Sequence, residues 1–172
     1  INDILEMSRI ESGRLELEYI PMDPCTVFDD MRDLFAEQMK QKNLDFRVHT
    51  GQVQHRYVWA DRKNLNRVLL NVISNAYKFT PEGGSINASL WEVSAGEDGY
   101  IPYEIRVQDT GIGMTKEFAE RMFNAFERER TSTVSGVEGT GLGMSITKSI
   151  IDLMGGTIEV LTAPGSGTQI VI

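Results

Sequence analysis

The sequence has little cysteine and no long hydrophobic run. Cys25 is the single cysteine among 172 residues, so no internal disulfide can form, and this usage suits a reducing cytoplasm. The richest apolar run, residues 68–73, is broken by Asn71 and falls short of the roughly 18 residues that a membrane helix needs. No basic segment followed by an apolar one marks a signal peptide. The sequence therefore predicts that this chain does not span a membrane.

Positive charge is also scarce. The chain carries 17 Lys and Arg against 25 Asp and Glu, a net charge of −8, and its basic residues are scattered. Nucleic-acid phosphates favour a basic stripe, so we expect no nucleic-acid partner. With 41% hydrophobic residues, the composition is typical of one folded, soluble, acidic domain. Because the sequence starts at Ile1 rather than Met, we expect a fragment of a longer protein.

Hydrophobic periodicity predicts helices separated by short strands. The helical segments are the end of a longer helix in residues 1–18, a helix over 25–42, a helix that begins after an N-cap at Asp61, and a helix over 144–154. Strands are predicted at residues 44–48, 57–59, 86–93, 101–107, 157–161 and 169–172. A linker is predicted around Pro21 and Pro24, a polar connection at Gly51 and Gln52, and a long loop over 128–143. This mixture favours an α+β two-layer sandwich over a doubly wound fold.

The helix after Asp61 carries three polar residues on one face. Asn71, Asn75 and Lys78 are spaced i, i+4 and i+7, which places them within roughly 60° of each other around the helix. An amide oxygen can bind Mg²⁺, and a lysine can neutralise phosphate charge. The pattern is compatible with a metal-bound polyphosphate, but also with an ordinary solvated helix edge.

Two glycine-rich segments follow. Asp109 ends a predicted strand and enters a turn with Gly111 and Gly113, where a carboxylate could accept a hydrogen bond from the amino group of a base. An ordinary Asx turn is the alternative. Residues 139–144 alternate glycine at the start of a helix, which is typical either of a phosphate-binding turn or of a flexible linker. Between these segments, Phe123 and Phe126 are predicted as core anchors that flank the long loop.

Four motifs occur in the order in which sensor histidine kinases carry their N, G1, F and G2 boxes. They are Asn71-x-x-x-Asn75-Ala-Tyr-Lys78-Phe-Thr80, Asp109-x-Gly111-x-Gly113, Phe123-x-x-Phe126 and Gly139-x-Gly141-Leu142-Gly143. Over about residues 22–172 the chain resembles the catalytic ATP-binding domain of that family. Residues 1–18 resemble the tail of the second helix of its dimerisation and phosphoacceptor domain. We therefore expect a helix end and linker in residues 1–20 and a catalytic domain in residues 21–172.

The resemblance implies the Bergerat-type ATP-binding fold shared with gyrase and chaperone ATPases, a two-layer sandwich whose helices cover one face of a mixed sheet. It implies binding of ATP and Mg²⁺. Asn75 would be the metal ligand, and Asn71 would support the phosphates or the waters of the metal. Lys78 would meet a phosphate, and Tyr77 would flank the nucleotide.

The same resemblance describes the base end of the site and the lid. Asp109 would bind the adenine amino group, with Gly111 and Gly113 shaping its pocket. Residues 127–143 would form the ATP lid, whose residues near the phosphates would be Gly139, Gly141, Leu142 and Gly143. Thr168 resembles the late Gly/Thr element of the fold.

The family's acceptor histidine is missing. In the family it precedes an acidic residue, whereas His49 is followed by Thr50 and His55 by Arg56. We expect a monomeric cytoplasmic fragment, inactive alone, that donates the γ-phosphate of ATP to a histidine on the phosphoacceptor domain of the same protein. That phosphate would pass to the aspartate of a response-regulator receiver domain. The family implies that the full-length protein is a membrane-associated homodimer.

Two other functions stay open. An ATP-hydrolysing switch of the gyrase or chaperone type would carry a glutamate on the Asn71 helix to activate water, and none occurs between Asp61 and Thr80. A non-catalytic regulatory module would use the fold only to bind a partner. The two histidines lack the Cys, His or paired acids of a zinc site, so they are predicted to lie at the surface or at a strand edge.

Overall fold

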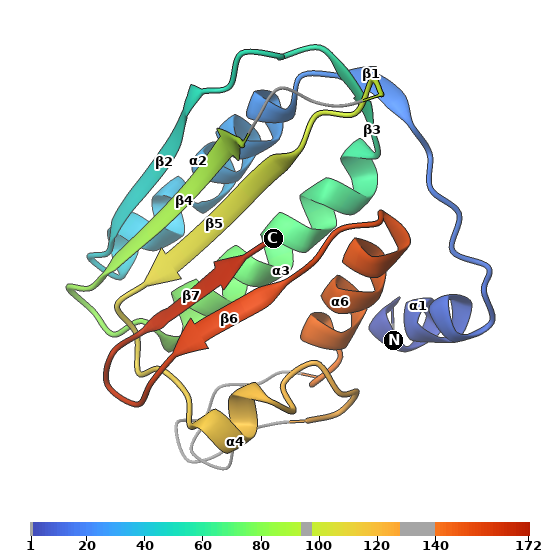
Figure 1. Cartoon of the computed structure of the whole chain (residues 1–172). Helices are drawn as coiled ribbons and strands as arrows, with labels where there is room; N and C mark the ends of the chain where they lie inside the picture. The colour runs from blue at the N-terminus through green and yellow to red at the C-terminus, as the bar shows by residue number, and fades with distance from the viewer. Residues whose placement is uncertain (1, 94–97, 128–139) are drawn as a thin grey trace.

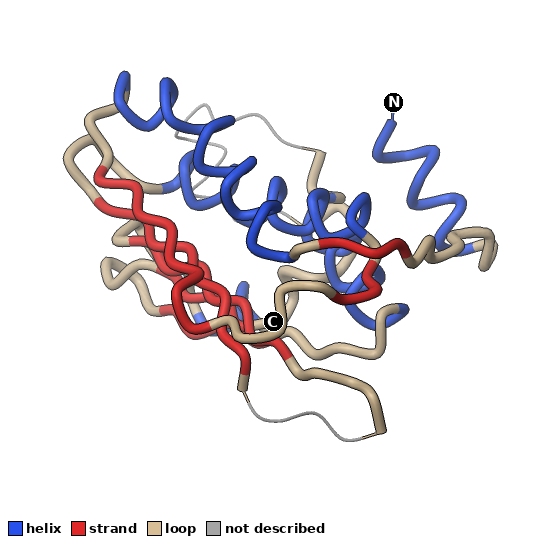
Figure 2. The backbone as a smooth tube through the Cα atoms, turned by 90° about the horizontal axis from the view of Figure 1, so that it is seen from above, coloured by secondary structure: helices blue, strands red, loops and turns tan. Residues whose placement is uncertain are grey.

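The computed structural model describes residues 2–93, 98–127 and 140–172, which form a five-stranded sheet with helices on one face (Figures 1 and 2). In spatial order the strands are β2 (Asp45–Gln52), β4 (Ser85–Glu92), β5 (Tyr103–Asp109), β7 (Thr168–Val171) and β6 (Glu159–Thr162). β2 and β4 are parallel, and the other neighbours are antiparallel. The sheet is therefore mixed, which confirms the predicted α+β two-layer sandwich.

Three helices form the second layer. They are α2 (Pro24–Gln41), α3 (Arg62–Phe79) and α6 (Gly143–Leu153), which lie together on one side of the strands (Figure 2). Their bounds confirm the helices predicted from periodicity. Among the described residues, two further helices lie at the periphery, α1 (Asn2–Glu11) beside α6 and the short α4 (Lys116–Ala119), which was not predicted (Figure 1). In the part of the chain that the structure describes, no helix has the length and apolar character needed to cross a bilayer.

The start of α3 is fixed by Asp61. Its carboxylate accepts a hydrogen bond from the backbone N–H of Asn64 at 2.9 Å, as expected of an N-cap, and another from the N–H of Glu18 at 2.9 Å. Burial alone would raise the pKa of this carboxyl, but the hydrogen bonds from Asn64 and Glu18 outweigh it and lower the pKa overall. Asp61 thus joins the segment that follows α1 to the first turn of α3.

The apolar stripe of α3 determines where the core lies. Leu69, Val72 and Ile73 are almost completely buried against α2 and the sheet, in the main core. Val68 turns instead toward α6, where it forms a second cluster with Leu142, Ile146, Ile150 and Ile151. Met7 and Ile10 of α1 pack on this second cluster. One helix therefore serves both clusters, and its remaining polar face is left for other contacts.

Two predictions in the N-terminal half were wrong. The predicted linker around Pro21 contains a strand, β1 (Ile20–Met22), which pairs antiparallel with β3 (Val58–Ala60) in a separate two-stranded sheet. Proline can occupy so short an edge strand because an edge does not use every N–H group. Gly51 and Gln52 belong to β2, which continues beyond a register shift between His49 and Gln52.

Candidate functional site

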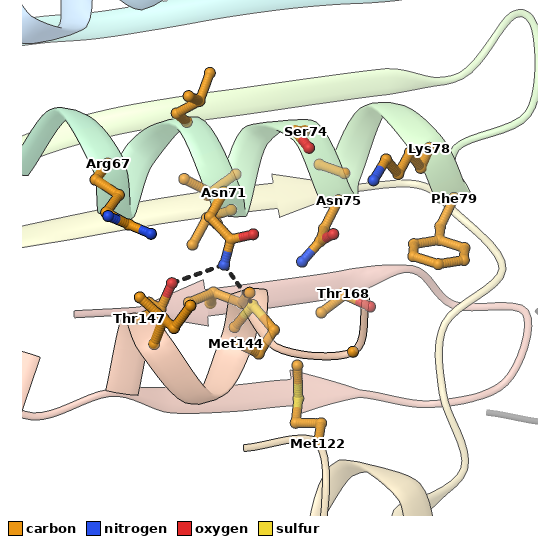
Figure 3. Close-up of a pocket in the computed structure, with 18 of the residues that line it drawn as sticks. Arg67, Asn71, Ser74, Asn75, Lys78, Phe79, Met122, Met144, Thr147 and Thr168 are labelled. Carbon is orange, nitrogen blue, oxygen red and sulfur yellow. Dashed lines mark hydrogen bonds between the residues drawn. The ribbon is translucent and has the colours of Figure 1, made fainter. Parts of the chain in front are cut away.

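A cavity of about 840 Å³ opens between α3, the adjoining ends of β5 and β7, and the segments around residues 112–122 and 140–147 (Figure 3). The polar face of α3 forms one wall. Predicted site residues that line the cavity are Asn71, Asn75, Lys78, Asp109, Gly113, Gly141, Gly143 and Thr168. Segments that are far apart in the sequence therefore meet at one site, as the resemblance implied.

The two asparagines of α3 have different surroundings. Asn71 donates a hydrogen bond from Nδ2 to Oγ1 of Thr147 at 2.7 Å, which joins α3 to α6 (Figure 3). Asn75, one turn further along, makes no side-chain hydrogen bond to any residue that the structure describes, and it points into the cavity (Figure 3). A carboxamide left without a protein partner in a cavity can ligate a hard cation or bind a phosphate. Lys78 is exposed at the same wall and adds positive charge.

Asp109 forms the opposite end of the site. The residue is only 9% exposed, and its Oδ1 accepts hydrogen bonds from the N–H groups of Gly111 at 2.8 Å and Thr168 at 3.2 Å. Burial raises the pKa of this carboxyl, and the two amide hydrogen bonds oppose the rise. Among the described residues nothing hydrogen-bonds Oδ2. That oxygen is available to accept a hydrogen bond from a ligand in the cavity.

Several glycines of the site, Gly111 and Gly143 among them, are needed because neighbouring groups approach very closely. A Cβ on Gly111 would lie 2.6 Å from the carbonyl oxygen of Phe79, so the turn after Asp109 can pack against the end of α3 only with glycine there. A Cβ on Gly143 would lie 2.3 Å from Oδ1 of Asn71. Gly111 therefore supports the site from behind without lining the cavity, whereas Gly143 lines it.

The remaining predicted residues have mixed outcomes. Leu142 is buried in the second cluster and does not line the cavity. Tyr77 does not line the cavity either, because it packs against the main core with the Lys42 ammonium 4.8 Å from its ring centre. Gly139 and most of the predicted lid, residues 128–139, lie outside the described residues.

The two aromatic residues before the predicted lid, Phe123 and Phe126, differ in burial. Phe123 is half-buried against the main core, but Phe126 is 68% exposed, so its prediction as a core anchor was wrong. Phe126 has a positive φ of 65°, and its backbone N–H donates to the carbonyl of Gly141 at 2.9 Å. The backbone of this residue, not its ring, fixes the chain next to the cavity.

Sequence reasoning missed two groups of cavity residues. One is an apolar wall that a flat ring could contact, formed by Phe79, Met114, Phe118, Met122 and Met144. The other is Arg67, which lines the cavity with Asp3 and Glu6 of α1. Arg67 precedes Asn71 by four residues and shares its helix face, so the spacing argument could have included it. The methionines have no spacing signal, because they come from separate segments.

Both histidines are exposed, as predicted, and neither lines the cavity. His55 Nδ1 lies 2.7 Å from Oε1 of Glu92 at the end of β4. In the part of the chain that the structure describes, no group of three or more His, Cys, Asp or Glu residues could hold a metal ion.

Comparisons with known proteins agree with this architecture. The sequence profile described as "Histidine kinase-, DNA gyrase B-, and HSP90-like ATPase" matches residues 60–172. The "Non-motile and phage-resistance protein" of Caulobacter vibrioides is 36% identical over 170 residues, covering 99% of this chain and 20% of that protein. "Sensor histidine kinase GacS" of Pseudomonas protegens is 34% identical over 169 residues, covering 98% of this chain and 18% of that protein. The chain thus spans about a fifth of the length of these relatives.

Among solved structures, that of full-length ShkA in complex with AMPPNP superposes with a TM-score of 0.83 at 28% identity. The similarity covers 99% of this chain and 34% of that one. It therefore includes α1, which lies outside the matched residues 60–172.

Proposed function

The chain belongs to the histidine kinase-, DNA gyrase B- and HSP90-like ATPase family, as a catalytic domain of the sensor histidine kinase type, and from this we propose how its cavity handles Mg-ATP. The adenine binds at the Asp109 end, and the phosphates extend along α3 past Asn75 toward Asn71. The observation that carries this proposal is that one cavity holds both the Asp109 Oδ2 and the Asn75 carboxamide, and neither makes a hydrogen bond to any residue that the structure describes.

In this proposal the protein acts by positioning and by charge neutralisation. Asp109 accepts a hydrogen bond from the adenine amino group, while the apolar wall contacts the ring. Asn75 holds Mg²⁺ together with the phosphates, and Asn71, Lys78 and the amides near Gly141 and Gly143 orient the phosphate chain. When bound, Mg²⁺ offsets the charge that develops on the transferred phosphoryl group. Thr168 keeps Asp109 in place through its backbone N–H.

The acceptor is proposed to be a histidine on the phosphoacceptor domain of the same protein. Neither His49 nor His55 lines the cavity, which supports an acceptor from elsewhere. We assign residues 1–20 to the end of the dimerisation helix with its linker, and residues 21–172 to the catalytic domain with a lid at 127–143. The phosphoryl group then passes to a response-regulator aspartate, in a full-length protein that is a homodimer.

The test is titration calorimetry of ATP with and without Mg²⁺, and of adenosine, into the purified chain. Asn75→Ala should weaken Mg-ATP binding about tenfold or more, because it removes the amide proposed to hold Mg²⁺ and the phosphates, and should leave adenosine binding unchanged. Asn87→Ala is the matched control, because Asn87 is also partly buried but lies on β4 outside the cavity.

Wild-type Mg-ATP affinity in Asn75→Ala would contradict the metal assignment, and a wild-type chain that binds no adenine nucleotide would contradict the whole proposal. An ATP-hydrolysing switch is not favoured, because α3 offers no glutamate to activate water. Substantial steady-state ATPase activity of the chain would reverse that conclusion.

A further inference from the structure

One end of the cavity is closed by an ion-pair cluster between α1 and α3. The guanidinium of Arg67 pairs with the carboxylate of Glu6 and lies 3.9 Å from Oδ1 of Asp3. Oδ2 of Asp3 accepts a hydrogen bond from the hydroxyl of Thr140 at 3.0 Å. All four residues line the cavity, and we call them the α1 latch. The latch brings two negative charges to the end of the site where we place the phosphates.

Apolar packing holds these carboxylates in position. Met7 and Ile10 of α1 pack on the second cluster, and α1 lies beside α6 (Figure 1). Glu6 immediately precedes Met7, so the docking of α1 on α6 delivers its carboxylate to Arg67. Glu6 is mostly buried there, with 15% of its side chain exposed. The latch therefore forms only when α1 occupies this site.

The position of Arg67 also suits the binding of an anion other than the Glu6 carboxylate. It lies one turn before Asn71 and two turns before Asn75 on the same face of α3, and all three side chains project toward the cavity (Figure 3). From Arg67 to Phe79, next to Asp109, the helix rises roughly 18 Å, a span suited to an extended nucleotide. A guanidinium binds carboxylate and phosphate oxygens in the same two-pronged manner. Glu6 thus occupies Arg67 in the way that a phosphate would.

We propose that Arg67 is a phosphate-binding residue of the nucleotide site, and that the carboxylates of Glu6 and Asp3 compete with the nucleotide for it. Docking of α1 and binding of a polyphosphate then oppose each other, since one guanidinium serves both and the carboxylates repel the phosphates. By linkage, whatever pulls α1 away raises the affinity for ATP, and ATP in turn favours the release of α1. This inference rests on the function proposed above.

The experiment compares ATP with adenosine by titration calorimetry, because adenosine has no phosphate to meet the latch. Glu6→Gln should raise ATP affinity about fivefold to tenfold, within the usual range of such coupling, and leave adenosine affinity unchanged. Glu11→Gln is the matched control, because it removes the same charge from the exposed end of α1 without touching Arg67. It should leave both affinities at the wild-type values.

Arg67 itself is tested in the Glu6→Gln background. There, replacing Arg67 does not leave a Glu6 carboxylate without its ion-pair partner. Adding Arg67→Gln to Glu6→Gln should lower ATP affinity about fivefold or more and leave adenosine binding intact, as expected for loss of a charged phosphate contact. Unchanged ATP affinity in either step, with normal adenosine binding, would overturn the latch and leave the proposed function standing. Failure of the wild-type chain to bind adenosine and ATP would overturn both.

Discussion

The two ends of the cavity are built from different interactions. At the Asp109 end, backbone N–H groups of Gly111 and Thr168 hold the carboxylate, Gly111 from the turn after β5 and Thr168 from β7, where it pairs with Asp109 in the sheet. At the Arg67 end, side chains from α1, α3 and the Thr140 segment hold one another. A site held by backbone groups of a sheet is set by the fold itself, whereas a site held by side chains of separate elements depends on how those elements dock. The first end, which we call the fixed end, suits constant recognition, and the second, which we call the adjustable end, suits regulation.

The largest expected effect is at the fixed end. Asp109→Ala removes the acceptor for the base and leaves two N–H groups without their partner, so adenosine affinity should fall about 30-fold to 100-fold. Calorimetry with adenosine measures the loss, and circular dichroism checks that the fold persists. Asp109→Asn, which keeps the shape, should lose less affinity and should alter the preference for ATP over GTP. Unchanged adenosine binding in Asp109→Ala would show that the base does not bind there.

A smaller effect is expected at the adjustable end. In Gly143→Ala the new Cβ would meet Oδ1 of Asn71, so Asn71 must turn away from Thr147, and ATP affinity should fall about fivefold with adenosine affinity unchanged. Gly51→Ala is the control, since a Cβ there meets no atom within 4 Å. Equal losses for ATP and adenosine would mean that the two ends are not separable.

The smallest effect is a dependence on pH. Because burial raises the pKa of Asp109, a larger fraction of its carboxyl is protonated at mildly acidic pH than for an exposed aspartate. The ionised form is the better acceptor, so adenosine binding should be strongest above this pKa and should decline as the pH falls through it. Asp109→Asn should remove the decline. A decline of the same size in that variant would assign it to another group.

Much of the fixed end could be predicted from the sequence. The spacing of Leu65, Val68, Leu69 and Val72 determines α3 and therefore the face on which Asn71 and Asn75 lie. Asp109 ends a strand with alternating burial, and the glycines after it mark the turn. These features depend on neighbours in the chain, so local patterns are sufficient to find them.

The adjustable end could not be predicted in the same way. The pairing of Arg67 with Glu6 joins residues in separate helices, and no local pattern relates them. Tyr77 belongs to the same motif as Asn75, but the helix turns it toward Lys42 and the core. Phe126 is an exposed aromatic residue with a positive φ, and its sequence signals neither property. Each of these outcomes depends on packing between distant elements.

The hydrogen bond from Glu18 to Asp61 gives α1 a mechanical connection to the nucleotide site. It clamps the chain at the root of α3, so only residues 12–17 separate this clamp from the end of α1. A force on α1 that breaks its contact with α6 would be transmitted along this short segment, and it would act on the first turn of α3. The helix that presents Arg67, Asn71 and Asn75 is therefore also the element on which this force would act.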